Sequence, residues 1–115
     1  MTKGTTIEAV LAHHGQALAS RNIDDILKDY TPDSVIFAPT GICKGLESIR
    51  AAFTGFLGLM TPEAISNMKM IKQDVHDEYV YVIWSALPAV TFGSDTLRIR
   101  NGKIIMQSVV FQTGR

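Results

Sequence analysis

A carboxyl group within an apolar pattern is the first candidate for chemistry in this chain. Asp95 shares one face of an alternating segment with Leu97 and Ile99, and such a two-residue period is typical of a half-buried β-strand. A carboxyl group on the apolar face of a strand is unfavourable unless it is neutral, paired or exposed at the strand end. Two interpretations therefore stay open: an acid that faces a pocket, or a solvated carboxylate at the end of the strand.

His14 is the second candidate, because it lies in the apolar stripe of a predicted helix at residues 6–20. The stripe follows helical spacing, which indicates a face turned toward a core. A histidine there can donate a hydrogen bond or titrate near neutral pH, or it can simply be satisfied by a neighbouring carbonyl. The adjacent His13 points in another direction and makes a poor metal pair with it. We expect neither a metal site nor a cofactor.

The elements that position these two residues can be read from periodicity and turn signals. Asn101-Gly102 predicts a tight hairpin turn, which makes residues 92–112 a β-hairpin. Pro88 predicts a bend or bulge, because proline cannot donate to a central ladder. The expected helices are residues 6–20, 22–30 and 46–57, and the expected strands are residues 34–38, 64–76, 79–89, 90–100 and 103–112.

The order of helices first and strands afterwards predicts an α+β domain that spans residues 1–115. We expect a cone-shaped, strongly curved, mostly antiparallel sheet with the three N-terminal helices packed on its concave face. Such a cone would enclose an apolar pocket, the usual kind of place for a small ligand.

Composition excludes several classes of function. The chain has 115 residues, of which 46% are hydrophobic, and its net charge is zero. Without a basic cluster, we expect neither nucleic acid nor a membrane surface as a partner. A single cysteine, Cys43, excludes an internal disulfide and a cysteine-based metal site. Residues 1–4 lead into a helix with no apolar signal core, so we expect a soluble, cytoplasmic protein.

Three stretches of the chain together match the pattern of a known family. Residues 21–35 read as a short acidic helix that ends in a tyrosine and leads through an acidic turn into a strand. Gly45, Ile49 and Phe53 mark a third helix, and residues 97–104 form a penultimate hairpin. In these features the chain resembles the nuclear transport factor 2-like superfamily, and within it the SnoaL-like polyketide cyclases and ketosteroid isomerases. The resemblance spans nearly the whole chain and implies the cystatin-like roll. It does not decide the function, because this fold carries enzymes and binding proteins alike.

The resemblance also suggests roles for single residues. Asp95 matches the isomerases' protonated aspartic acid, which donates a hydrogen bond to the developing oxyanion. His14 falls at the position of their first-helix tyrosine, which shares in that interaction. Their catalytic aspartate precedes a proline, where this chain has Ala38 before Pro39, and a methyl group cannot accept a proton.

Two hypotheses follow, an enzyme and a binding protein. The enzyme would be an isomerase, cyclase or dehydratase that acts beside a carbonyl of a small cyclic apolar substrate, with His14 and Asp95 as the acid–base pair. The alternative is a non-catalytic ligand-binding or accessory domain, which Ala38 favours. The family also implies a homodimer through the sheet, with Val110, Ile104 and Tyr81 covered. The expected pocket residues are Tyr30, Phe37, Ala38, Phe53, Phe56, Trp84, Gln107, Val109 and Phe111. For most of the aromatic residues among them, ordinary core packing is the alternative.

Overall fold

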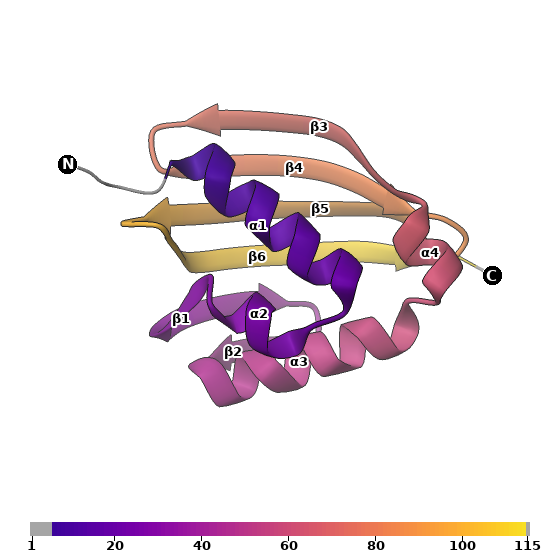
Figure 1. The fold of residues 1–115 in the computed structure, drawn as a ribbon, viewed down its shortest axis with the longest axis horizontal. Helices are drawn as coiled ribbons and strands as arrows, with labels where there is room; N and C mark the ends of the chain where they lie inside the picture. The colour runs from indigo at the N-terminus through magenta and orange to yellow at the C-terminus, as the bar shows by residue number, and fades with distance from the viewer. Residues whose placement is uncertain (1–5, 115) are drawn as a thin grey trace.

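The fold combines four helices and six strands in the computed structural model, which describes residues 6–114. Residues 1–4, for which we expect no signal core, lie outside this range. The helices lie on one side of the sheet (Figure 1), which confirms the α+β class. The elements are α1 (Ile7–Ser20), α2 (Ile23–Leu27), β1 (Tyr30–Ala38), β2 (Gly41–Lys44), α3 (Leu46–Leu59), α4 (Pro62–Ser66), β3 (Met68–His76), β4 (Tyr79–Ala86), β5 (Val90–Arg100) and β6 (Lys103–Thr113).

The six strands form one mixed sheet in the order β2-β1-β6-β5-β4-β3. Strands β1 and β6 are parallel, and every other neighbouring pair is antiparallel. Pairing of the first strand with the last places β5 and β6 in the middle of the sheet. The hairpin that carries Asp95 therefore lies at its centre, with α1 crossing in front of this part of the sheet (Figure 1).

Both ends of α1 are fixed by identifiable contacts. The Thr6 side chain caps the start by accepting a hydrogen bond from the backbone N–H of Ala9. Arg21 follows the last turn in the left-handed conformation, with φ at 59°. Its guanidinium donates to the backbone oxygens of Leu57 and Met60 at 2.8 and 2.7 Å. These bonds join the end of α1 to the end of α3, whose free carbonyls favour a cation.

The predicted turns are confirmed. Asn101 and Gly102 both have positive φ, 53° and 76°, and they join β5 to β6 so that Arg100 pairs with Lys103. This is the backbone that an Asn-Gly hairpin turn requires. Pro88 lies in the turn between β4 and β5, so β4 ends at Ala86 rather than at residue 89. The hairpin therefore projects Asp95 from the middle of β5.

The prediction that a strand begins at residue 64 is wrong. Residues Pro62–Ser66 form α4, and β3 begins at Met68. Thr61 caps this helix by accepting from the backbone N–H of Ala64, and proline is well suited to the first helical position. The signal for a helix start was present in the sequence, but the helix itself is shorter than two turns.

The prediction that the second helix reaches residue 30 is also wrong. Helix α2 ends at Leu27, and Tyr30 is the first residue of β1, paired with Ile104. The backbone N–H of Ile104 donates to the backbone carbonyl oxygen of Asp29 at 2.7 Å. The chain therefore enters the sheet after only two residues that follow the helix. Strand β2, which pairs with β1 across the turn at residues 39–40, was not predicted.

Ile104 corrects a further prediction, because it is fully buried rather than exposed on the outer sheet face. Alternation along β6 puts Gln107 on the inner face and would put Ile104 on the outer one. The register between β5 and β6 shifts between Arg98 and Ile99, whose partners are Met106 and Ile104. This bulge inserts one residue and reverses the facing of the strand before it.

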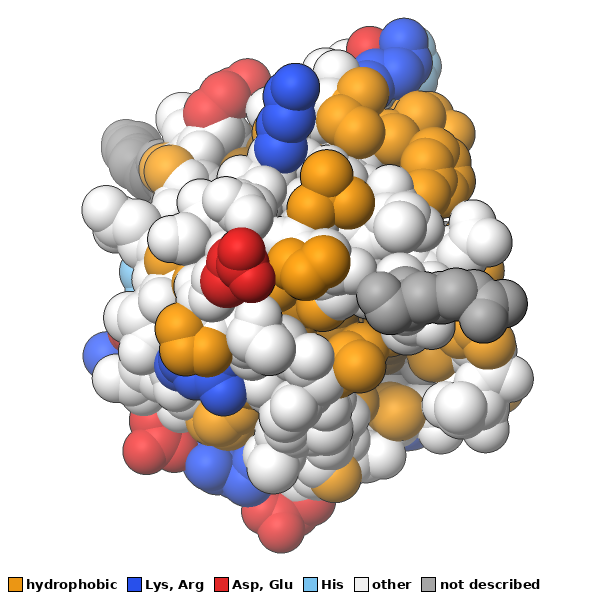
Figure 2. All heavy atoms as spheres, turned by 90° about the vertical axis from the view of Figure 1, so that its right-hand side faces the viewer, with side chains coloured by type: hydrophobic (Ala, Val, Ile, Leu, Met, Phe, Trp, Pro, Cys, Tyr) orange, Lys and Arg blue, Asp and Glu red, His pale blue; other side chains and the backbone are white. Residues whose placement is uncertain are grey.

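Exposed apolar side chains gather in patches on the surface. Figure 2 shows the end of the molecule that carries α4 and the β4–β5 turn, with apolar patches among polar atoms. Exposed large apolar residues of the elements at this end are Leu59, Leu87 and Phe92. None of the helices in residues 6–114 has the length and apolar character needed to cross a membrane.

Candidate functional site

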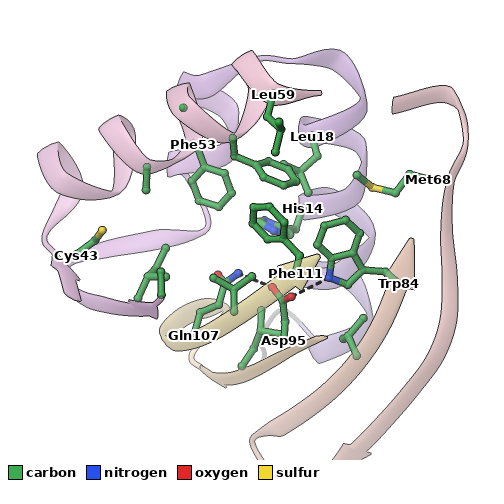
Figure 3. Close-up of a pocket in the computed structure, with 18 of the residues that line it drawn as sticks. His14, Leu18, Cys43, Phe53, Leu59, Met68, Trp84, Asp95, Gln107 and Phe111 are labelled. Carbon is green, nitrogen blue, oxygen red and sulfur yellow. Dashed lines mark hydrogen bonds between the residues drawn. The ribbon is translucent and has the colours of Figure 1, made fainter. Parts of the chain in front are cut away.

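A cavity of about 650 Å³ lies between the helices and the sheet. Its wall is built from α1, α3, β1 and the strands β2 to β6, and Figure 3 shows side chains from these elements converging on it. Most of the lining side chains are apolar, with a few polar groups among them. A largely apolar cavity with few convergent polar groups is the usual form of a small-molecule site.

Asp95 projects from β5 into this cavity, and both of its carboxyl oxygens are held. The Trp84 indole N–H donates to Oδ1 and the Gln107 side-chain N–H donates to Oδ2, each at 2.8 Å (Figure 3). Burial raises the pKa of Asp95 above its usual value, because an apolar wall disfavours the charged form. The bonds from Trp84 and Gln107 act in the opposite direction without cancelling this effect. Asp95 is thus a fixed carboxyl group with a raised pKa.

The orientation of the Gln107 side-chain amide is set by Tyr30. The Tyr30 hydroxyl donates a hydrogen bond to the Gln107 side-chain oxygen, which leaves the amide N–H₂ to face Asp95. Burial raises the pKa of Tyr30 well above its usual value, so the hydroxyl keeps its proton as a donor. Tyr30, Gln107 and Asp95 therefore form a chain in which each group fixes the next.

A glycine makes room for the indole that holds Asp95. Gly93 pairs with Trp84 across β4 and β5, and a Cβ atom at Gly93 would lie 2.3 Å from the indole ring. Only glycine lets the ring lie over the neighbouring strand at this distance. Gly93 therefore permits the hydrogen bond between Trp84 and Asp95.

His14 reaches the same cavity from α1. Its ring lies edge-on to the rings of Tyr30 and Phe53, with centroids 6.0 and 5.9 Å apart. Its Nδ1 is buried and has no hydrogen-bond partner among residues 6–114. The Asp29 Oδ2 atom lies 3.6 Å from this nitrogen, which is too far for a hydrogen bond. The His14 side chain is therefore held by packing. Its Nδ1 atom is unusual, because buried polar atoms in proteins nearly always have a hydrogen-bond partner.

The remaining predicted residues divide into two groups. Tyr30 is buried behind the cavity wall, where it contacts the lining residues Gln107 and His14. Phe37 is exposed at 45% of its surface on β1, away from the lining. The predicted residues that line the cavity are Ala38, Phe53, Phe56, Trp84, Gln107, Val109 and Phe111, together with His14 and Asp95.

The sequence matches the model of the SnoaL-like domain over residues 10–106. The chain belongs to the SnoaL-like domain family. This family is part of the nuclear transport factor 2-like superfamily, so the resemblance noted from the helix and hairpin motifs is confirmed.

Solved structures show the same fold at low sequence identity. A SnoaL-like protein of unknown function from Burkholderia thailandensis has a TM-score of 0.76 at 11% identity, with 91% of this chain and 93% of that chain covered. A candidate polyketide cyclase from Sinorhizobium meliloti has a TM-score of 0.72 at 12% identity, with coverages of 88% and 93%. TerC, co-crystallised with polyporic acid, has a TM-score of 0.66 at 16% identity, with coverages of 90% and 88%. No curated protein matches the chain by sequence.

Two residues at or near the site of this SnoaL-like domain were missed by sequence reasoning. Cys43, which was not among the expected pocket residues, is a free thiol that lines the cavity. Asp29, which lies 3.6 Å from His14 Nδ1, was not considered as a site residue. One signal in the sequence could have pointed to Asp29. It follows Asp25 by four residues, and the first helix of the chain carries two adjacent histidines. Within residues 6–114, no three His, Cys, Asp or Glu side chains gather closely enough to hold a metal ion.

Proposed function

We propose that this SnoaL-like domain binds a small cyclic, mostly apolar molecule with a carbonyl group, and that it catalyses an isomerisation, cyclisation or dehydration beside that carbonyl. The observation that carries the proposal is that Asp95 and His14 line one apolar cavity. Asp95 has a raised pKa and a fixed orientation. An acid and a base that share a mostly apolar site are suited to moving a proton.

In this proposal Asp95 is the protonated partner of the substrate oxygen. Its O–H donates a hydrogen bond to the carbonyl oxygen, where negative charge develops in an enolate-like transition state. His14 takes the proton from the adjacent carbon, and the electron pair of that C–H bond forms the new carbon–carbon double bond. General acid–base catalysis by one positioned group accounts for roughly 10²–10⁴-fold in rate.

The similar structures support the class of ligand rather than its identity. One is described as a candidate polyketide cyclase, and another was crystallised with polyporic acid. By analogy, we propose an oxygen-bearing ring as the ligand of this chain. The sheet would curve around it as a cone, with the helices on the concave face.

A non-catalytic binding domain is the second candidate, and Ala38 favours it. Ala38 lines the cavity at the position where the resemblance to isomerases places the base, and its methyl group adds only apolar surface. In this case Asp95 and Gln107 would orient a ligand oxygen without any proton transfer. The same cavity would then serve recognition or an accessory role.

We also propose that the domain forms a homodimer through the outer face of the sheet. Tyr81 and Val110 are exposed at 41% and 53% of their surface, and a second sheet would cover them. Light scattering at micromolar concentration tests this directly, since a monomer there contradicts the dimer.

The exchange of protons for deuterium beside a carbonyl tests catalysis without knowledge of the natural substrate. Cyclic ketones and enones are incubated with the protein in heavy water, and the loss of the adjacent proton signal is followed by NMR. We expect exchange that falls roughly 10²–10⁴-fold in Asp95→Asn and stays unchanged in Asp74→Asn, which alters an exposed carboxylate on β3. Compounds that bind with no exchange above background would favour the binding domain.

A further inference from the structure

Two adjacent histidines on α1 meet one buried carboxylate. His13 donates from Nδ1 to the Asp29 oxygens at 2.7 and 2.9 Å, and its Nε2 lies 3.1 Å from Asp25 Oδ1. The neighbouring His14 has its Nδ1 3.6 Å from Asp29 Oδ2. Asp29 is 5% exposed, so the carboxyl group that these two imidazole rings approach is largely out of contact with water.

The Nδ1 atom of His14 is the one buried side-chain nitrogen or oxygen in residues 6–114 without a hydrogen-bond partner. Such an atom needs an explanation, because an unsatisfied buried polar group is costly. The rings of Tyr30 and Phe53 pack against His14 in T-shaped arrangements, and neither supplies an acceptor at hydrogen-bond distance from Nδ1. The carboxyl oxygen within 4 Å of it is Asp29 Oδ2.

The position of Asp29 decides which nitrogen of His14 carries the proton. A lone pair on Nδ1 would face a carboxylate oxygen and be repelled by it, whereas an N–H there is attracted to it. Asp29 is itself fixed by His13 and cannot turn away. With the proton on Nδ1, Nε2 keeps its lone pair, and Nε2 has no protein partner in residues 6–114.

We propose that Asp29 is a positioning residue that holds neutral His14 in the Nδ1–H form, so that the lone pair lies on Nε2 of a ring that lines the cavity. The contact at 3.6 Å shortens to a hydrogen bond when His14 takes up a proton, as catalytic contacts commonly tighten. This assigns the two groups of the proposed function: His14 is the base and Asp95 is the acid. That assignment rests on the proposed function, but the tautomer of His14 does not.

The groups that face His14 come from each element packed against it. His13 lies on the same helix, and Asp29 is in the connection between α2 and β1. Tyr30 begins β1, Phe53 is uncharged on α3, and Asp95 faces the same cavity from β5. Asp29 is thus the one carboxyl group within 4 Å of the His14 ring nitrogens in residues 6–114.

Nitrogen-15 NMR of the histidine rings tests the proposal without any substrate. Spectra are recorded at about pH 8.5, above the ordinary histidine pKa of about 6.5, and long-range couplings report which ring nitrogen carries the proton. The chain has three histidines, so His14→Gln identifies the signals of His14. We expect the Nδ1–H form to predominate in the wild-type protein. A predominant Nε2–H form in the wild-type protein overturns the proposal. Because the tautomer is measured on the wild-type protein, this outcome does not depend on whether a variant folds.

A pair of variants separates positioning from general damage to the structure. Asp29→Asn replaces the carboxylate by an amide of the same shape, and we expect the ratio of Nδ1–H to Nε2–H in His14 to fall about tenfold. Asp25→Asn removes the other carboxylate of His13 but does not touch His14, so the ratio should stay unchanged. An equal fall in both variants, or no fall in Asp29→Asn, contradicts the role of Asp29.

The same variants keep this inference distinct from the proposed function. If His14 is in the Nδ1–H form but the protein exchanges no substrate proton, the proposed catalysis fails while the role of Asp29 stands. If exchange occurs and depends on Asp95 while His14 is in the Nε2–H form, the catalysis stands and the role of Asp29 fails.

Discussion

Asp29 lies within 4 Å of the His14 ring and Asp95 lines the same cavity as His14, and these two carboxyl groups differ in what holds them. Asp95 accepts hydrogen bonds from the uncharged groups of Trp84 and Gln107. Asp29 accepts from His13, whose pKa is raised by its hydrogen bonds to Asp25 and Asp29. One carboxyl group is fixed by neutral donors in an apolar wall, and the other is fixed by an imidazole that can be charged.

One fold thus gives two carboxyl groups different surroundings, and we expect the two groups to have different roles. Burial raises the pKa of Asp95, and the hydrogen bonds from Trp84 and Gln107 and the nearby His14 lower it by less, so the pKa stays above its usual value. Asp29 instead accepts hydrogen bonds from the His13 imidazole, which hold its carboxyl group in place beside His14. Substitutions around each carboxyl group should therefore have effects of different size and different pH dependence.

Gly93→Ala should have the largest effect, because the new methyl group would collide with the indole of Trp84 at 2.3 Å. The ring must move away from Asp95 or the strands must separate, and such overpacking typically costs about 1–3 kcal/mol. Chemical denaturation measures this loss. The matched control is Gly58→Ala in α3, where no atom lies within 4 Å of the added carbon; this variant should gain up to about 1 kcal/mol. Equal effects of both substitutions would contradict the close approach.

Gln107→Leu should lower the free energy of unfolding by about 1–3 kcal/mol, because the buried Tyr30 hydroxyl then has no acceptor. Adding Tyr30→Phe removes that hydroxyl, so the double variant should lose less than the sum of the two single losses. Strictly additive losses in a denaturation series would show that the two side chains do not depend on each other.

The stability difference between the wild-type protein and Asp95→Asn should change with pH. The folded pKa of Asp95 lies above its usual value of 3.8, so between these two values the folded protein binds more protons than the unfolded chain. Wild-type stability relative to the variant therefore falls as pH rises from about 3.8 through the raised pKa, by about 1.4 kcal/mol for each pH unit that separates the folded from the unfolded pKa. Unfolding curves at a series of pH values measure the difference. A difference that grows with pH would contradict the raised pKa.

The smallest effect is expected for His13→Gln. The folded pKa of His13 is raised above 6.5, so its contribution to stability is fully present below about pH 6.5 and is lost as pH rises through the raised value. Since about a third of this side chain is exposed, screening should keep the contribution below about 1 kcal/mol. Melting temperatures of both proteins near pH 6 and pH 9 provide the comparison, and a difference that grows toward pH 9 would be inconsistent with it.

Local pattern was sufficient for much of the fold. Alternation identified the strand of Asp95, Asn101-Gly102 identified its hairpin, and helical spacing identified the apolar stripe of α1. Ile104 shows where such reasoning stops, because one inserted residue in β6 reverses the facing of the residues before it. A bulge arises from pairing between strands, so the periodicity of a single strand does not reveal it.

The site was predictable only where a residue breaks its local pattern. Asp95 and His14 interrupt apolar faces, which made them visible in the sequence. Asp29 is an ordinary acidic residue after a short helix, and only folding brings it against His13 and His14. Phe37 illustrates the opposite case, since an aromatic residue expected in the pocket lies exposed on β1.

The most direct test of the central claim is the melting temperature of the wild-type protein and of Asp95→Ala with a panel of phenols, cyclic enones and aromatic carboxylates. A ligand that binds the folded state raises the melting temperature by mass action. We expect phenols or enones to raise the melting temperature of the wild-type protein, and we expect this rise to be lost in Asp95→Ala. No rise with any compound, or an equal rise in both proteins, would contradict the claim that Asp95 organises a ligand site in this cavity.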